Sequence, residues 1–122
     1  MSFTNFKVPY SIDERFNKRV AYFSMEFAIH QPLKIYSGGL GFLAGSHLRS
    51  AFELNQNMIG IGMLWKYGYY DQARNQDQTL QVTFMEKMYS FLEDTGIKYQ
   101  ILIHDHPVWV KAYYLAPNTF CS

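Results

Sequence analysis

The sequence predicts an α/β fold that carries an antiparallel β appendage, and three observations support this. Two short apolar runs, Val20–Met25 and Met58–Trp65, are typical of strands buried on both faces of a parallel sheet. Between them lies a glycine-rich segment and then a stretch with the period of an amphipathic helix, residues 43–54. After residue 65, apolar and polar residues alternate, as they do in antiparallel sheets. Strand, helix and strand in this order predict a right-handed β–α–β unit.

The elements follow one another without a repeat or a flexible linker. The lead-in before residue 19 includes a short predicted helix over Ile12–Lys18. The first strand ends at Glu26, and a predicted loop containing Pro32 and Gly38–Gly41 follows it. We therefore expect residues 1–122 to form a single unit.

The predicted helix presents one apolar face and one polar side. Its apolar positions fall at i, i+4, i+7 and i+8, namely Ala44, Leu48, Ala51 and Phe52. On the polar side, Arg49 and Glu53 are spaced for an i,i+4 ion pair, although in the less favourable orientation.

The segment from residue 66 onward is predicted to be the β-rich appendage on a core of residues 20–65. Alternation predicts strands at Leu80–Phe84, Ile97–Ile103 and Val108–Tyr114, with His104–Pro107 as the turn between the last two. The stretch Met85–Leu92 fits either a strand or one or two helical turns. Two parallel strands and a hairpin would leave open edges and a half-covered sheet. We therefore expect part of a larger domain, with a small complete α+β domain as the alternative.

Composition excludes several classes of protein. Of the 122 residues, 48% are hydrophobic and 18% are aromatic, which excludes a disordered chain. The net charge of +1 gives no basis for binding nucleic acid or an acidic membrane. No apolar stretch long enough to span a membrane and no signal peptide is visible, which predicts a cytoplasmic protein. A lone cysteine, Cys121, supports no disulfide framework. His104 and His106 lack further ligands nearby in the sequence, so we expect no metal site.

The motif Gly38-Gly39-Leu40-Gly41 is the strongest candidate for a site. Glycines between a strand and a helix allow close approach to the backbone, and the helix N-terminus favours an anion. The motif matches neither the Walker pattern nor the dinucleotide fingerprint. A backbone cradle for a phosphate or sugar phosphate and a tight turn without a ligand both remain open.

Three ordered blocks resemble a known family. They are Val20–Phe27, Ile35–Gly45 and Gly60–Gln72, and together they resemble the N-terminal domain of α-glucan (glycogen, starch and maltodextrin) phosphorylases, in the shorter bacterial and archaeal branch. The resemblance covers residues 20–72 well and the rest more loosely. It implies the GT-B architecture of glycosyltransferases, in which two Rossmann-like domains flank the active site, and this chain would be part of the N-terminal one.

The resemblance also implies an activity and a cofactor. Such enzymes are hexosyltransferases that cleave α-1,4-glucan or maltodextrin with inorganic phosphate to give glucose 1-phosphate. They use pyridoxal phosphate, bound through a lysine in the second domain, so the attachment site would be absent from this chain. The chain would then hold no complete catalytic set and be inactive alone. Assembly into a homo-oligomer is compatible with the resemblance.

Individual positions carry over from the family motifs. The resemblance places the substrate- and phosphate-binding main chain at Gly38, Gly39, Leu40 and Gly41, and an acidic residue near the pocket at Glu26. It places an aromatic border of the sugar path at Tyr67, Tyr69 and Tyr70, to which His47 can be added as a residue near the loop. Packing is the alternative role for these rings, and loop capping is the alternative role for Glu26. This chain departs from animal-type members at Ala28, where they have tyrosine, and from many short-branch members at Ser46, where they have an acid.

Two other functions remain open. A glycogen or starch synthase-like segment of the same architecture uses a similar Gly-Gly-Leu loop, but synthases have lysine where this chain has Tyr36. A stand-alone module that binds α-glucan or a protein partner without catalysis would be favoured by a well-closed hydrophobic core within the chain, as it would by measurable maltodextrin binding.

Overall fold

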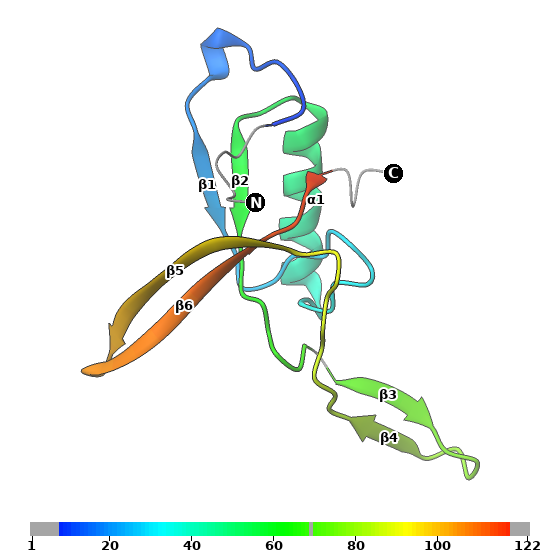
Figure 1. Ribbon diagram of the computed structural model, residues 1–122. Helices are drawn as coiled ribbons and strands as arrows, with labels where there is room; N and C mark the ends of the chain where they lie inside the picture. The colour runs from blue at the N-terminus through cyan, green and yellow to red at the C-terminus, as the bar shows by residue number, and fades with distance from the viewer. Residues whose placement is uncertain (1–7, 69, 118–122) are drawn as a thin grey trace. The chain divides into compact units, whose positions relative to one another are not determined.

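The computed structural model describes residues 8–68 and 70–117, and these residues fall into two compact units (Figure 1). One unit is residues 10–88, and the other is built mainly from residues 89–117. This division lies further along the chain than the boundary at residue 66 that the sequence suggests. The elements, in order, are the 3₁₀ turn η1 (Glu14–Phe16), β1 (Val20–Phe23), α1 (Gly39–Glu53), β2 (Met58–Ile61), β3 (Asp71–Arg74), β4 (Leu80–Thr83), β5 (Glu93–Ile103) and β6 (His106–Tyr114).

A β–α–β unit occupies the first half of the chain, as the sequence predicts. β1 and β2 pair in parallel, from Val20 opposite Met58 to Phe23 opposite Ile61, and α1 connects them. Both strands are four residues long and therefore shorter than the apolar runs that predicted them. The predicted helix at residues 12–18 is only the 3₁₀ turn η1, which Asp13 caps by accepting the Arg15 amide.

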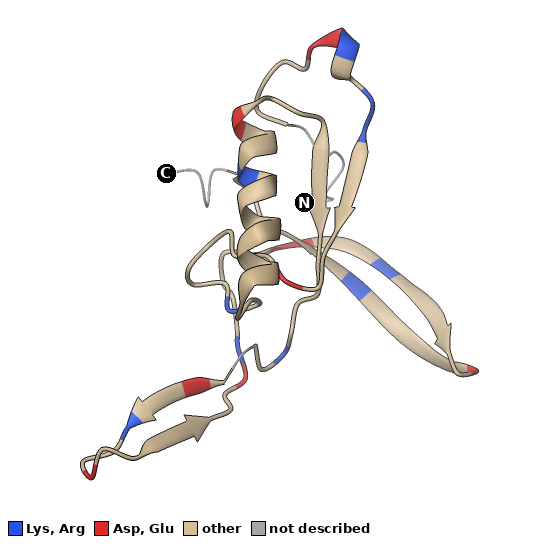
Figure 2. Ribbon diagram, turned by 180° about the vertical axis from the view of Figure 1, so that it is seen from behind, with Lys and Arg blue, Asp and Glu red and all other residues tan. Residues whose placement is uncertain are grey.

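Among the described residues, α1 covers one face of the parallel sheet. Tyr22 stacks on His47 of α1 with 4.9 Å between ring centroids, and a Cβ on Gly60 would lie 2.8 Å from Leu48. The neighbouring residues on each strand point to the other face, where the side chain of Phe23 is 71% exposed and that of Ile61 is 42% exposed. The prediction that these strands are buried on both faces is therefore wrong for this chain, whereas the predicted half-covered sheet is confirmed. Neither strand carries a charged residue (Figure 2).

The helix α1 begins four residues earlier than its hydrophobic period predicts. Gly38 is the N-cap, and Gly39–Gly41 form the first turn instead of a loop. Glycine contributes nothing to a hydrophobic pattern and has a low helix propensity, which hides this turn from the sequence. The buried positions of the helix are all small: Gly41, Ala44, Gly45 and Ala51.

Most of the core of this unit comes from the connection between β1 and α1. Four of its side chains are less than a tenth exposed, namely Phe27, Ile29, Leu33 and Ile35, and they are joined by Ala44 and Ala51 of the helix. A connection without regular structure gives no periodic signal, so the sequence predicts only a loop for this hydrophobic segment.

The two hairpins are antiparallel. β3 pairs with β4, and β5 pairs with β6 from Ile103 opposite His106 outward. The turn between β5 and β6 consists of His104 and Asp105, both with positive φ, as a two-residue type I′ turn requires. The predicted turn is thus in the right place, although His106 and Pro107 already belong to β6.

Some sequence expectations have a different outcome in this part of the chain. β3 was not predicted, and Met85–Leu92 contains neither helix nor strand. Cys121 lies outside the described residues. Among the residues that the structure describes, no helix is both long and apolar enough to span a bilayer.

Candidate functional site at the start of α1

The start of α1 lies beside open space at Gly38 and Gly39. Gly38 has an extended backbone, and no side chain caps the helix. The first helical hydrogen bond is donated by the Phe42 amide to the Gly38 carbonyl, at 3.2 Å, so the amides of residues 38–41 have no partner within the helix. No atom lies within 4 Å of a Cβ built on Gly38 or Gly39, and the side chain of Leu40 is 56% exposed. We call this arrangement the glycine corner, residues 38–41.

The glycines of the corner have two different roles. Gly38 and Gly39 have free space beside them, whereas a Cβ on Gly41 would lie 2.7 Å from the Tyr36 Cβ and 2.9 Å from Glu26 Oε2. One turn later, a Cβ on Gly45 would lie 2.4 Å from the Ala28 carbonyl oxygen. The Ala28 amide also donates a hydrogen bond of 2.9 Å to the Gly41 carbonyl. Gly41 and Gly45 therefore let the chain after β1 lie directly on the helix backbone.

Glu26 is held beside the first turn of α1. Its Oε2 accepts a 3.2 Å hydrogen bond from the Ser37 amide. Its main chain is fixed by the Ser24 hydroxyl, which donates to the Glu26 carbonyl at 2.8 Å, while the indole of Trp65 donates to the adjacent Met25 carbonyl at 3.2 Å. A carboxylate in this position interacts favourably with the positive end of the helix dipole. Glu26 thus performs the loop-capping role, and its charge also faces any ligand of the corner.

The described residues among those suggested for the sugar path each contact another side chain. His47 stacks on Tyr22, as described above. Tyr67 is 51% exposed, and the Lys66 ammonium lies 5.5 Å from its ring centroid. Tyr70 is 48% exposed and makes an edge-to-face contact with Phe84, with centroids 6.0 Å apart. Tyr69 lies outside the described residues.

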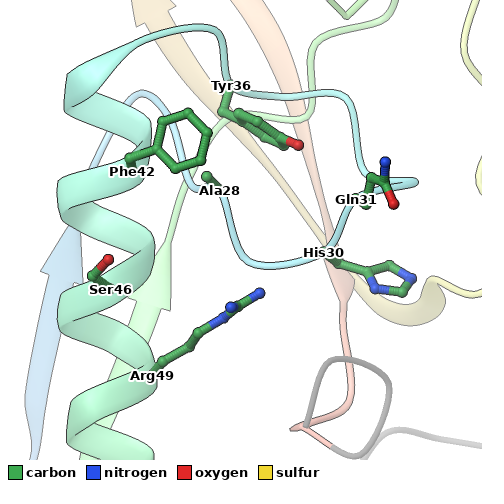
Figure 3. Close-up of a pocket in the computed structure, with 7 residues that line it drawn as sticks. All are labelled: Ala28, His30, Gln31, Tyr36, Phe42, Ser46 and Arg49. Carbon is green, nitrogen blue, oxygen red and sulfur yellow. The ribbon is translucent and has the colours of Figure 1, made fainter. Parts of the chain in front are cut away.

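A separate hollow of about 180 Å³ lies between α1 and the chain that precedes it (Figure 3). It is lined by Ala28, His30, Gln31, Tyr36, Phe42, Ser46 and Arg49. None of these residues belongs to the predicted binding site, although Ala28 and Ser46 are the positions where the sequence departs from the pattern of the family that it resembles. The signal that the sequence did offer is Arg49, a cation on the polar side of the helix.

Arg49 does not form the ion pair with Glu53 that its spacing allows. Its Nη2 instead donates a 2.7 Å hydrogen bond to the Ile29 carbonyl. The order arginine before glutamate is the weaker one for an i,i+4 pair, and the carbonyl is within reach. In the described part of the chain, no three His, Cys, Asp or Glu side chains gather closely enough to hold a metal ion.

Comparisons with known proteins place these features in context. No protein-family model matches the chain. An uncharacterized protein of Methanocaldococcus jannaschii is 55% identical over 103 residues, which is 84% of this chain and 20% of the relative. The maltodextrin phosphorylase of Thermococcus litoralis is 44% identical over 63 residues, 52% of this chain and 8% of the enzyme. The glycogen phosphorylase of Mycobacterium tuberculosis is 37% identical over 83 residues, 68% of this chain and 9% of the enzyme.

The chain therefore spans a fifth or less of the length of these relatives. Two of the three are named as phosphorylases, one of maltodextrin and one of glycogen, and the identity to each lies in the range expected of proteins with a common ancestor. This chain contains a phosphorylase-related segment.

Proposed function

We propose that this chain is part of the N-terminal Rossmann-like domain of a cytoplasmic α-glucan phosphorylase of the GT-B type. The complete enzyme would cleave an α-1,4-glucan or maltodextrin with inorganic phosphate and release glucose 1-phosphate. This chain would supply the glycine corner and have no activity alone, because it holds no complete catalytic set. The identity to the maltodextrin and glycogen phosphorylases supports the family, and the β–α–β unit is compatible with the architecture.

The observation that carries the proposal is the open space beside Gly38 and Gly39. The amides at the start of α1 have no partner within the helix and can donate to an oxygen of a sugar or phosphate, and the space beside Gly38 and Gly39 is open to such a ligand. Donors fixed in this way stabilise developing charge without reorganisation during the reaction. The Glu26 carboxylate nearby can accept a sugar hydroxyl, and its negative charge limits how close a phosphate can come.

Pyridoxal phosphate does not fit the described residues. The cofactor forms an imine with a lysine that burial keeps neutral. None of the lysines in residues 8–68 and 70–117 is buried, and Lys66, Lys87 and Lys111 are each paired with a carboxylate. The lysine and the rest of the cofactor site would have to lie on other residues of the enzyme, so no step is assigned to the cofactor here.

The stand-alone binding module is less well supported. A closed hydrophobic core would favour it, but the described residues include large apolar side chains that are more than half exposed, among them Phe23, Leu43, Phe84 and Trp109. The synthase-like alternative remains disfavoured by Tyr36 and gains nothing from the relatives named above.

A chimera tests the proposal. The host is the Thermococcus litoralis enzyme, in which the 63 residues that align with this chain are exchanged for the corresponding residues of this chain. The assay measures the phosphate-dependent release of glucose 1-phosphate. We expect the chimera to be active and the isolated chain to be inactive. Gly39→Ala keeps the backbone amide but places a methyl group in the open space beside it, and in the chimera it should lower kcat/KM by up to about 100-fold, the effect of a ligand that no longer reaches one preorganised donor.

The matched control is Ser50→Ala, which changes an exposed position near the other end of α1 and should leave activity unchanged. The proposal fails if a folded chimera has no phosphorolytic activity, or if Gly39→Ala retains full activity. Turnover by the isolated chain would contradict the statement that it is inactive alone.

A further inference from the structure

The hollow beside α1 has an aromatic end and a cationic end. Figure 3 shows the rings of Phe42 and Tyr36 next to each other at one end and the Arg49 side chain extending from the helix at the other, with Ala28 between them. The two rings meet edge to face, with centroids 5.6 Å apart. The volume of about 180 Å³ is well above the roughly 10–15 Å³ that a single water needs on the same measure, so the hollow has room for a small anion.

The hollow contains more hydrogen-bond donors than the protein uses. Within residues 8–68 and 70–117, the Arg49 guanidinium makes one hydrogen bond, to the Ile29 carbonyl, and no ion pair, which leaves most of its five N–H groups available. In the same part of the chain, the side chains of Gln31, Tyr36 and Ser46 make no hydrogen bond. All four groups can donate.

The charge of the hollow favours a negative ligand. No Asp or Glu is among its seven lining residues. Arg49 and Glu53 are the charged residues of α1, and they do not neutralise each other (Figure 2). The glycine corner differs in this respect, because the Glu26 carboxylate lies against its first turn. A free oxyanion is therefore better accommodated in the hollow than at the corner.

We propose that this hollow binds a small free oxyanion of the inorganic phosphate class. The Arg49 guanidinium holds the charge, since a planar guanidinium matches the oxygens of phosphate. The hydroxyls of Ser46 and Tyr36 and the amide of Gln31 donate to the remaining oxygens. The proposal concerns this hollow alone, and it does not depend on the glucan chemistry proposed for the glycine corner.

The test is a titration of the isolated chain with inorganic phosphate at constant ionic strength, followed by NMR. The reporters for the hollow are the Ala28 methyl group, the Ser46 amide and the Arg49 side-chain N–H, while the amides of residues 38–41 report on the corner. We expect saturating shifts at the hollow in the millimolar range, with weaker saturation by acetate and none by glucose. Arg49→Gln should weaken binding by about tenfold or more, because it removes a charge-assisted contact.

Two further variants separate binding from folding. Ser46→Glu places a carboxylate on an exposed position of the hollow without changing Arg49, and it should abolish phosphate binding. Arg15→Gln removes a guanidinium that is already paired with Asp13 outside the hollow, and it should leave the affinity unchanged. The far-UV circular dichroism of each variant shows whether α1 is intact.

Three results would overturn the proposal. The first is no saturable shift at the hollow with phosphate. The second is phosphate binding that Ser46→Glu leaves intact in a folded chain. The third is shifts confined to residues 38–41 and unaffected by Arg49→Gln, which would reject the hollow while supporting a phosphate at the glycine corner.

Discussion

Replacing Gly45 by alanine should destabilise the β–α–β unit, although alanine is the better helix former. The new Cβ would lie 2.4 Å from the Ala28 carbonyl oxygen and 2.8 Å from its carbonyl carbon, and both atoms belong to the backbone, which cannot rotate away. Overpacking of this kind costs about 1–3 kcal/mol, and the shortness of this contact points to the upper end. Moving the chain away would also break the hydrogen bond from Ala28 to Gly41, worth about 1 kcal/mol.

The gain in helix propensity, about 1 kcal/mol, offsets only part of this cost. The expected loss in the free energy of unfolding is therefore about 3 kcal/mol, measured by urea denaturation with far-UV circular dichroism. Gly39→Ala is the matched control, because a Cβ there meets nothing within 4 Å and the stability should change by no more than about 0.5 kcal/mol. Equal midpoints for Gly45→Ala and the unchanged chain, or equal losses in both variants, would refute the packing argument.

Three more predictions concern other parts of the chain. Thr95→Val should raise the hydrogen-exchange rate of the Ile97 amide. The buried Thr95 hydroxyl accepts a hydrogen bond from that amide at 3.1 Å and donates one to the Ala112 carbonyl at 2.7 Å. Losing both should lower the free energy of local opening by about 1–3 kcal/mol. The pKa of Asp94 lies below its ordinary value of 3.8, chiefly because the Lys111 ammonium donates a hydrogen bond to the carboxylate. The carboxylate should therefore stabilise the β5–β6 hairpin fully above pH 3.8, and this stabilisation should be lost as the pH falls through the lowered pKa. Phe23→Asp should reduce self-association in light scattering while lowering the unfolding free energy little, since the ring is 71% exposed.

Each of these has its own control. Thr83→Val in β4 changes a threonine whose side chain makes no hydrogen bond in the described residues, and it should leave exchange at Ile97 unchanged. Asp94→Asn should remove the acid-dependent change in hairpin signals, and a hairpin that responds to acid equally with asparagine would disprove the assignment to Asp94. Asp105→Asn changes a carboxylate in the turn and should not remove the response. Self-association that is unchanged by Phe23→Asp would mean that another surface causes it.

The sequence predicted the order of elements well where hydrophobic period and turn chemistry act locally. The β–α–β order and the β5–β6 hairpin follow from alternating or helical patterns, and the turn at His104 and Asp105 follows from residue types that tolerate positive φ. β3 was missed because its residues, Asp71–Arg74, include a single apolar side chain and so show no alternation.

Burial and the details of the site were harder to predict, because they depend on contacts between distant residues. The sequence predicts a single role for Gly38–Gly41. In the structure, Gly41 packs closely and Gly39 does not, because Glu26 and Tyr36 lie beside Gly41. The hydrogen bond from Arg49 to Ile29 joins residues 20 positions apart, which no local pattern reveals. The exposure of Phe23 depends in turn on what covers the second face of the sheet.

The close contact of the chain at Ala28 with Gly41 and Gly45 has a practical consequence. Since backbone meets backbone there, the position of Glu26 relative to the first turn of α1 is determined by neighbouring main chain and hardly at all by adjustable side chains. A protein engineer could therefore move residues 24–53 into a related host as one cassette and keep the geometry between carboxylate and amides. Libraries built on such a graft should leave both packed glycines untouched.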